Sequence, residues 1–284
     1  RVISAVCGSL LIFAPMCFAR YLGKGGVGLT MALLAVSPSL VMVSRTANGI
    51  AIALICLVIA LVGVERAKNS NGADGISMII IGVIVGIMCG HSFTIPLLLI
   101  VFILMRNIYV AKMLLEALRV SFIDRTVTYV FIVLLVTTTF FRHRYGFMSV
   151  TESWVQWISG WSPYLRMRSI LLIPEIALFS QPLLMLLSVV GGGIALRGRC
   201  IERTMSVLLI CGLLYGLIYS GVQSSDVIWV VIPLFILCAR IALWALQGIW
   251  SAEEVVVATI QAAVLSSLIV FGYFIVGGVD FASN

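Results

Sequence analysis

The chain alternates between long apolar runs and short polar or charged stretches along almost its whole length. An apolar run of about 20 residues can cross the ~30 Å hydrocarbon core of a bilayer as a helix, which keeps its own backbone groups hydrogen-bonded. The pattern therefore predicts an all-α, polytopic transmembrane helical bundle of about ten membrane segments in a single domain, 1–284. The predicted segments are 2–19, 27–43, 48–64, two within 76–105, 126–141, 170–196, 204–222, 227–243 and 255–279.

The run 76–105 decides the topology, because it can form one helix or two. As one straight helix it would be about 45 Å long, well beyond the thickness of the hydrocarbon core, and His91 interrupts it. If the chain turns at His91, the stretches that carry most of the arginines and lysines share one side, as the positive-inside rule requires. Those stretches are 20–26, 65–75, 106–125 and 196–203. We therefore predict two helices here, with the basic stretches on the cytoplasmic side.

Two segments are predicted to lie on the membrane surface instead of crossing it. The stretch 106–125 is basic and amphipathic, which is typical of a helix on the cytoplasmic face. The stretch 142–169 carries Trp154, Trp157 and Trp161 at near-helical spacing, which is typical of an interfacial loop or helix on the outer face.

Polar features converge on the outer side in this topology. Arg45 lies between the second and third segments, His91 at the turn within 76–105, and Asp226 in the turn 223–226. A charged group costs a few kcal/mol in lipid, so it is usually placed for a partner or a water-filled cavity. A functional site is therefore expected on the outer side.

The composition excludes a soluble domain: 62% of the residues are hydrophobic, 10% are charged, and the mean hydropathy is +1.20. The net charge of +7 is expected to orient the chain and to contact anionic membrane lipid, not nucleic acid. The seven cysteines show no metal-binding or redox spacing and are interpreted as packing residues, with no metal site. No phosphate-loop, dinucleotide or hydrolase motif occurs. Apolar sequence begins directly after Arg1, so an internal or processed piece is expected.

Several short motifs occur in a characteristic order. They are Ser37-Pro38 with Ser44-Arg45, then Gly82 and Gly86 before His91, then Thr137-Thr138-Thr139-Phe140 ahead of Trp154 and Trp157, and finally Tyr219-Ser220 before the stretch 229–234. This order resembles the GT-C superfamily of membrane glycosyltransferases over roughly residues 1–245. The resemblance is to the protein-O-mannosyltransferase-like and aminoarabinose-transferase-like branch, glycosyltransferase family 39.

The resemblance implies an integral, multi-pass enzyme of a prokaryotic plasma membrane. Such an enzyme transfers a sugar from a polyprenyl-phosphate-linked donor to an acceptor at the outer face, with inversion at the anomeric carbon. A carboxylate deprotonates the acceptor, cationic groups hold the departing phosphate, and a divalent metal assists in some members. On this chain the resemblance assigns donor phosphate binding to Arg45 and His91. It assigns sugar or acceptor contacts to Trp154, Trp157 and Tyr219.

The chain also departs from the pattern of the family. The family's catalytic Asp or Glu lies in the first outer loop, and this chain is expected to begin beyond that point. In the branch an acid follows Ser-Arg, whereas 46–49 contains no acid here. His91 occupies the position where the branch usually has a lysine. The charged pair that the branch has in the late segment is absent from 221–225. Asp226 and Glu152 are the remaining candidates for the catalytic carboxylate.

Each candidate has a structural alternative that the sequence leaves open. Arg45 can extend to lipid headgroups, His91 can bond to backbone, and Asp226 can cap a turn. The tryptophans can form an interfacial belt. The functional hypotheses are a GT-C glycosyltransferase, a non-catalytic GT-C-like scaffold subunit that binds partner proteins, and a lipid or solute transporter or flippase with broken helices around His91.

Overall fold

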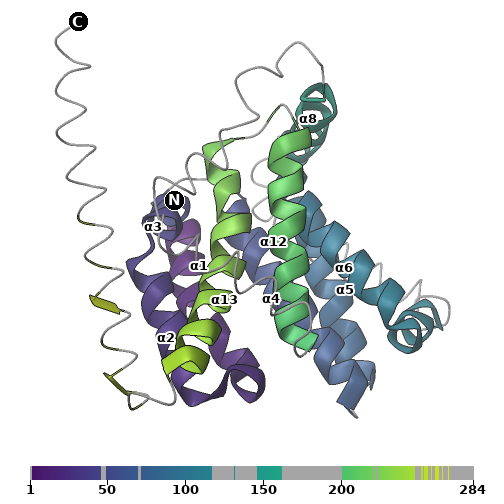
Figure 1. The fold of residues 1–284 in the computed structure, drawn as a ribbon. Helices are drawn as coiled ribbons and strands as arrows, with labels where there is room; N and C mark the ends of the chain where they lie inside the picture. The colour runs from purple at the N-terminus through teal and green to yellow at the C-terminus, as the bar shows by residue number, and fades with distance from the viewer. Residues whose placement is uncertain are drawn as a thin grey trace, which may run out of the picture.

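The computed structural model describes residues 2–45, 49–69, 72–116, 131, 146–161, 200–219, 221, 223–246 and a few positions between 251 and 268. This described part is helical and contains no strand, in agreement with the predicted all-α class (Figure 1). The elements are α1 (Val2–Ile12), η1 (Ala14–Phe18), α2 (Ala19–Val36), α3 (Pro38–Arg45), α4 (Ile50–Asn69), α5 (Gly72–Met88), η2 (Gly90–Phe93), α6 (Thr94–Arg106), α8 (Gly146–Ser159), α12 (Cys200–Ile218), η4 (Ser224–Val227) and α13 (Ile228–Leu246). The predicted segments 126–141, 170–196 and 255–279 lie wholly or mostly outside these residues.

Two helical stretches in the described part, Ile3–Val36 and Ile50–Lys68, are long and apolar enough to cross a membrane. The helical stretches Gly90–Arg106 and Ile108–Glu116 are bent by 105° relative to each other, and they give a third span if the pair is counted as one. The remaining apolar stretches, Gly72–Met88, Arg203–Ile218 and Ile228–Leu243, have 10–17 residues and reach at most about 25 Å, short of the ~30 Å hydrocarbon core. The described residues are thus consistent with a membrane protein, and they do not confirm a bundle of ten spans.

The stretch Ile3–Val36 is interrupted where the sequence predicts a turn. Pro15 lies in the 3₁₀ helix η1, and Gly23 adopts φ 72° and ψ 167° inside α2. A positive φ is accessible to glycine without the steric cost that other residues meet. Gly8 of α1 faces Ser44 of α3, so α2 leads the chain back along α1 (Figure 1).

Helices α4 and α5 form an antiparallel hairpin whose backbones touch. A Cβ added to Gly75 would lie 2.4 Å from the Ala67 nitrogen and 2.6 Å from the Gly63 oxygen. A Cβ added to Gly82 would lie 2.7 Å from the Cys56 oxygen. These glycines therefore serve close helix packing.

The run 76–105 consists of two helices, as predicted. Helix α5 ends at Met88, η2 contains Gly90 with φ 72°, and α6 begins at Thr94. Ile103 of α6 and Glu65 of α4 line the same pocket, while Gly75 of α5 packs on the same end of α4. Helix α6 therefore returns to the end of the bundle from which α5 starts.

Helices α12 and α13 form a second hairpin, closed by η4, and α13 also packs along α2. Gly212 of α12 lies against the backbone of Trp229, where a Cβ would be 3.2 Å from its carbonyl oxygen. Trp229 and Phe235 are among the largest fully buried side chains. Helices are therefore present where the segments 204–222 and 227–243 were predicted, and their crossing of a membrane stays a prediction.

The helix that follows α6 runs across the bundle. The segment Ile108–Glu116 is bent by 105° from Gly90–Arg106, and its Val110 is buried. A Cβ on Gly72 would lie 2.4 Å from the terminal methyl of Met113. This segment covers only part of the predicted surface helix 106–125, and its position relative to a membrane stays a prediction.

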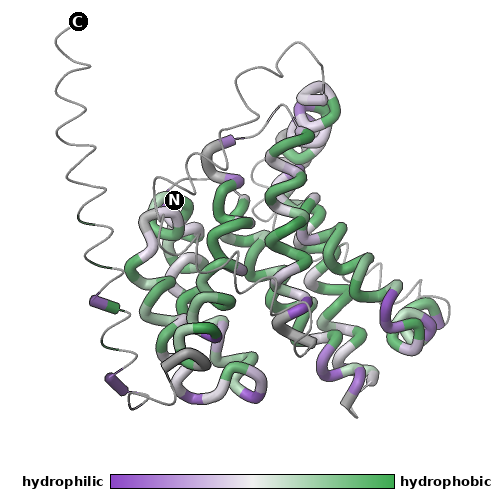
Figure 2. Tube along the Cα trace, in the orientation of Figure 1, coloured by the Kyte–Doolittle hydropathy of each residue, from purple (hydrophilic) through white to green (hydrophobic). Residues whose placement is uncertain are grey.

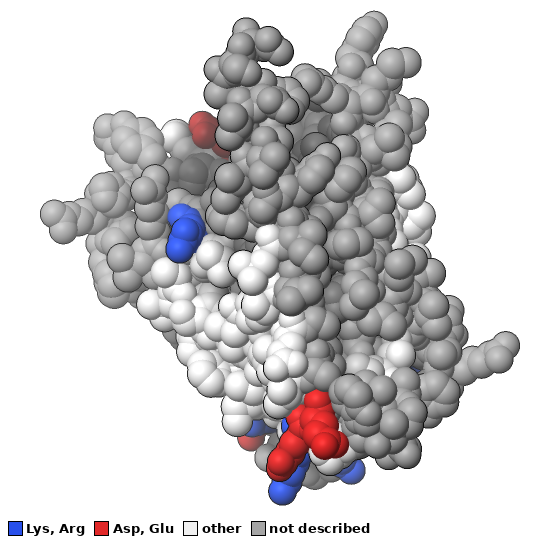
Figure 3. All heavy atoms as spheres, turned by 60° about the vertical axis from the view of Figure 1, so that its left-hand side comes forward, with Lys and Arg blue, Asp and Glu red and all other residues white. Residues whose placement is uncertain are grey.

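The bundle has two polar ends separated by apolar helix centres (Figure 2). We call one the Arg45 end; there Gly49 packs against Cys89, α8 packs on η2, and α3 packs on η4. We call the other the basic end. It contains a pocket whose lining includes Tyr21, Glu65, Lys68, Ile103 and Thr204. On the face drawn in Figure 3, acidic and basic side chains gather at the lower end. The described parts of the predicted basic stretches therefore share one end of the bundle.

Candidate functional site

The Ser-Pro motif that leads to Arg45 has a structural explanation. The Ser37 hydroxyl accepts a hydrogen bond from the Leu40 backbone N–H at 3.3 Å, and Pro38 occupies the first position of α3. A capping serine and a proline at the first helical position are both typical of a helix N-terminus. The Ser44 hydroxyl donates to the Val41 carbonyl at 2.8 Å. The motif thus builds a short helix whose last residue is Arg45.

Arg45 is exposed at the C-terminal end of α3. A cation there interacts favourably with the helix dipole. No hydrogen bond or ion pair joins its guanidinium to another residue in the described ranges. Because α3 packs on η4 and α13, the Arg45 backbone is anchored while its side chain is available to a ligand.

His91 is half-buried in η2, and helix α8 holds its imidazole. The His91 Nδ1 lies 2.7 Å from the Ser153 hydroxyl, and the His91 backbone N–H donates to the same oxygen at 3.2 Å. A Cβ on Gly90 would lie 2.3 Å from the Ser153 oxygen, and Gly90 also has φ +72°. Glycine at this position is therefore required both by the turn and by the approach of α8.

The hydrogen bonds of Ser153 indicate the tautomer of His91. The Ser153 oxygen accepts the backbone N–H of His91, so its single hydrogen can be donated to Nδ1. Nδ1 is then the acceptor, and Nε2 carries the ring hydrogen. The Nε2–H group has no hydrogen-bond partner among the described residues. His91 can therefore donate a hydrogen bond to a ligand at the Arg45 end. The sequence left open a hydrogen bond from the imidazole to backbone, and the structure has one to the Ser153 side chain instead.

The predicted sugar-binding aromatics form one cluster. The rings of Trp154 and Trp157 meet edge to face at 5.9 Å, and Trp157 meets Trp161 in the same way at 5.6 Å. Tyr219 lies 6.2 Å from Trp157 and 5.4 Å from Trp161, and it stacks on Tyr215 at 4.9 Å. Such pairs contribute about 0.5–1.5 kcal/mol each beyond area burial. The cluster thus attaches α8 to the end of α12.

Tyr219 occupies a slot between two glycines. A Cβ on Gly160 would lie 2.4 Å from the Tyr219 hydroxyl oxygen, and one on Gly221 would lie 2.6 Å from it. Tyr219 is only 3% exposed, whereas Trp161 is 45% exposed. Of these rings, Trp161 therefore presents the open surface. The helical spacing of Trp154, Trp157 and Trp161 predicts that the three rings share a face, and the ring contacts of Trp157 with both of the others agree with it.

Two tryptophan N–H groups of α8 behave differently. The Trp154 Nε1 donates to the Ile87 carbonyl at the end of α5, at 3.4 Å. The Trp157 Nε1 is buried and has no hydrogen-bond partner in the part of the chain that the structure describes. The Tyr215 hydroxyl lies near it but outside hydrogen-bonding geometry. Because an unpaired buried donor costs about 1–3 kcal/mol, Trp157 can serve as a donor to a bound hydroxyl.

Asp226 is buried in the turn between α12 and α13, with 2% of its surface exposed. Its Oδ2 accepts the Gln223 backbone N–H at 3.0 Å, and its own N–H donates to the Gln223 carbonyl at 2.9 Å. The predicted turn-capping role is therefore present. Burial raises the pKa of Asp226 to about 6, against the opposing effect of the Gln223 hydrogen bond.

The remaining candidates are less well placed. Glu152 lies on the exposed side of α8. No three His, Cys, Asp or Glu side chains in the described residues could hold a metal ion, so these residues do not form the divalent-metal site of some GT-C members. The thiols of Cys7 in α1, Cys56 in α4 and Cys89, which follows α5, lie near one another, a proximity that the sequence did not predict.

The Arg45 end therefore combines an exposed guanidinium, an imidazole N–H, a buried carboxyl group and an aromatic cluster. The first can bind a phosphate, the second can donate to it, and a carboxyl group with a pKa near neutrality can exchange a proton. Comparisons with family models, with curated proteins and with solved structures gave no match to this chain.

Proposed function

We propose that the chain is a GT-C-type glycosyltransferase, or its membrane part. It transfers a sugar from a polyprenyl-phosphate donor to an acceptor hydroxyl at the outer face of a prokaryotic plasma membrane. The observation that supports this most is the position of Asp226, a buried carboxyl group whose turn packs against the helix that ends in Arg45. The basic end then faces the cytoplasm, in line with the positive-inside rule.

Arg45 and His91 are the proposed donor phosphate contacts. A guanidinium offers paired N–H groups that match two phosphate oxygens, and Arg45 is exposed for this purpose. The Nε2–H of His91, whose ring is fixed by Ser153, donates to the same phosphate. Both groups stabilise the negative charge that develops on the phosphate as the sugar leaves.

Asp226 is the proposed general base. With a pKa of about 6, the carboxyl group is mostly ionised at pH 7 and remains a better base than an ordinary aspartate. It takes the acceptor hydroxyl's proton while the acceptor oxygen bonds to the anomeric carbon. The bond from that carbon to the phosphate oxygen breaks on the opposite face, which inverts the configuration. Because Asp226 is buried, the turn 223–227 opens for the acceptor.

The aromatic cluster is the proposed sugar or acceptor contact, with Trp161 as its exposed ring. Aromatic rings combine an apolar face with a polar edge, and the buried Trp157 N–H supplies a hydrogen-bond donor beside it. Trp154 and Tyr219 support the cluster, since Trp154 bonds to α5 and Tyr219 is enclosed by glycines.

The test uses the full chain in native membranes or nanodiscs with a panel of polyprenyl-phosphate sugars, and it measures release of polyprenyl phosphate. We expect Asp226→Asn to lower kcat by about 10²–10⁴-fold. We expect Arg45→Gln to raise KM about 10- to 100-fold, because a hydrogen bond to a charged group is lost. Arg66→Ala, at the basic end, is the matched control and leaves both constants unchanged. Activity that survives Asp226→Asn would overturn the assignment of the base.

A non-catalytic GT-C-like scaffold is the second candidate. It is favoured by the internal bonding of several motif residues, since Ser37, Ser44 and Asp226 each have a hydrogen bond within their own turn or helix. This candidate predicts no turnover of any donor and stable co-purification with partner proteins. A third outcome, movement of labelled lipid across liposomes without sugar transfer, would indicate a flippase.

A further inference from the structure

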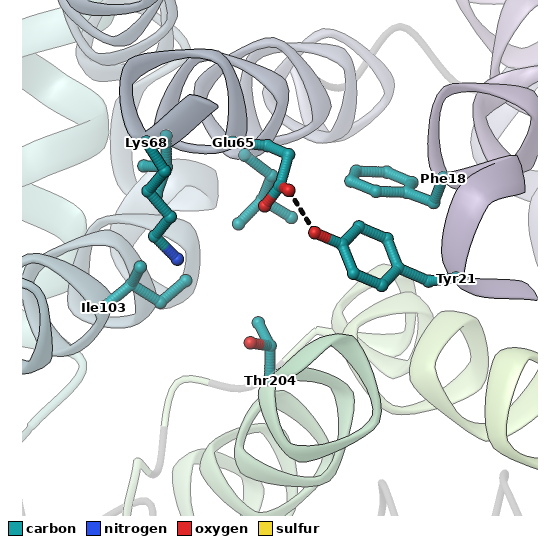
Figure 4. A pocket seen from close by; sticks show the side chains of 8 residues that line it. Phe18, Tyr21, Glu65, Lys68, Ile103 and Thr204 are labelled. Carbon is teal, nitrogen blue, oxygen red and sulfur yellow. Dashed lines mark hydrogen bonds between the residues drawn. The ribbon is translucent and has the colours of Figure 1, made fainter. Parts of the chain in front are cut away.

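The helix Ile108–Glu116 starts from a fixed point at the basic end. Ile103, in the last turns of α6, lines the pocket of this end, and the Lys68 ammonium is directed toward it (Figure 4). The Ile103 carbonyl accepts the Asn107 backbone N–H at 3.0 Å and the Asn107 side-chain N–H at 2.7 Å. From there the chain bends by 105° into Ile108–Glu116. Because α6 packs along α4 and α12, the helix that follows lies across the end of the bundle.

One side of Ile108–Glu116 packs on the bundle. Val110 is 1% exposed, and Leu114 lies against the hydrophobic core. The terminal methyl of Met113 fills the space beside Gly72, at the start of α5. These residues share one face of a helix, because they are three and four positions apart. The helix is therefore docked on the protein by an apolar inner face.

The opposite side is also apolar, and it carries a cation. Ile108 is 63% exposed and Tyr109 is 69% exposed, and Leu115 is exposed as well. Lys112 shares the face of Ile108 and Leu115 at helical spacing. It is exposed and forms no ion pair with another residue that the structure describes. Large apolar side chains that a protein leaves exposed together mark an interaction surface.

The exposed face of α6 indicates which partner fits this surface. Large apolar residues are exposed along α6 at helical spacing; they are Leu98, Val101, Phe102 and Met105. This face has the composition expected for contact with hydrocarbon. The outer face of Ile108–Glu116 follows it directly in the chain, and there Tyr109 and Lys112 join the apolar residues. Such a change in composition is typical of the passage from the hydrocarbon core to the membrane–water interface.

We propose that Ile108–Glu116 is an interfacial anchor that contacts anionic phospholipid at the basic end. Ile108, Tyr109 and Leu115 enter the boundary between headgroups and acyl chains, and the Lys112 ammonium contacts the headgroup anions. The sequence pattern predicts only that this part of the chain lies on a membrane surface, and the packing of the inner face decides which side meets lipid. The anchor lies at the opposite end from Arg45, so it does not depend on the transferase proposal.

The test replaces Tyr109 with photoreactive p-benzoylphenylalanine in the full chain, in nanodiscs with equal amounts of phosphatidylglycerol and phosphatidylcholine. Irradiation and mass spectrometry then identify the molecules that this position contacts. We expect lipid adducts at Tyr109 and none when Met113, on the inner face, is replaced in the same way. We expect phosphatidylglycerol to predominate among the adducts, and an added Lys112→Gln substitution to lower its ratio to phosphatidylcholine about fivefold.

The matched control is Lys24→Gln, which removes an exposed cation of α2 outside the anchor and leaves this ratio unchanged. Equal effects of Lys112→Gln and Lys24→Gln would show that general surface charge, and not the anchor, attracts anionic lipid. Protein adducts at Tyr109, or no adducts, would overturn the lipid assignment, and lipid adducts at both Tyr109 and Met113 would contradict the two faces. Wild-type midpoints of thermal unfolding verify that the variants are folded, and no readout depends on sugar transfer.

Discussion

The Arg45 end and the basic end of the bundle differ in the burial of their polar groups. At the Arg45 end, Asp226 is 2% exposed and Tyr219 is 3% exposed, and Ser153 bonds to His91 across a separation of 62 residues. At the basic end, Arg66 and Lys68 are exposed on the last turn of α4. One end thus has a few polar groups in fixed positions, and the other has exposed charges on its helix ends.

The contrast shows which polar groups carry information about function. Exposed charges at helix ends contribute little to stability, and they report mainly on orientation through the positive-inside rule. A buried polar group costs free energy unless a partner satisfies it, so its position is specified by the fold. For this reason the proposed reaction is assigned to the Arg45 end, where the polar groups have fixed partners.

The largest effect that separates the two ends is expected from pH. Asp226 has a pKa of about 6 in the folded chain, against an ordinary value of 3.8, so between about pH 4 and pH 6 the folded state binds more protons than the unfolded state. Stability then falls as the pH rises through this window, by about 3 kcal/mol in total. Unfolding by denaturant in micelles measures this slope. Asp226→Asn removes the contribution, and an unchanged slope in this variant would show that Asp226 is not the titrating group.

The next largest effect is expected where Gly160 contacts the Tyr219 side chain. In Gly160→Ala the new Cβ would lie 2.4 Å from the tyrosine hydroxyl oxygen, so α8 or the end of α12 must shift, at a cost of about 2 kcal/mol. Gly28→Ala is the control, because no atom lies within 4 Å of its Cβ position, and alanine is expected to stabilise α2 by about 0.5–1 kcal/mol. Similar midpoints of thermal unfolding for the two variants would contradict the described docking of α8.

A smaller effect is expected for the hydrogen bonds between α8 and η2. Ser153→Ala removes the partner of the His91 backbone N–H and of Nδ1, and we expect a loss of about 1 kcal/mol with faster amide exchange at His91. Ser159→Ala removes only an exposed bond to the Gln156 carbonyl in its own helix and serves as the control. If amide exchange at His91 were the same in both variants, Ser153 would not hold the turn.

The smallest effect is expected at the basic end. Arg66 is exposed, so Arg66→Ala should change the unfolding free energy by less than about 0.5 kcal/mol, and added salt should reduce even this difference. A loss above about 1 kcal/mol would mean that the charges of this end support the fold, and the contrast between the two ends would no longer hold.

Some of these features were accessible to prediction because they are local. The break at His91 and the turn 223–226 interrupt apolar runs, and both occur where expected. Ser251 and Glu254 exchange hydrogen bonds as a capping box, and these bonds lower the pKa of Glu254. The Ser-x-x-Glu spacing is a sequence signal for such a box. The grouping of Trp161 with Trp154 and Trp157 was also predictable from helical spacing, whereas the exposure of Trp161 was not.

The sequence by itself determined the helical class, the apolar helix centres and the sharing of one end by the basic stretches, because periodicity, hydropathy and charge act over short distances along the chain. Only the tertiary structure decided that Ser153 holds His91 and that Asp226 is buried with a raised pKa. Such relations depend on which helix ends meet. Apolar helices can pack in many arrangements with similar patterns, and the choice among them comes from side-chain fit, as between Gly160 and Tyr219.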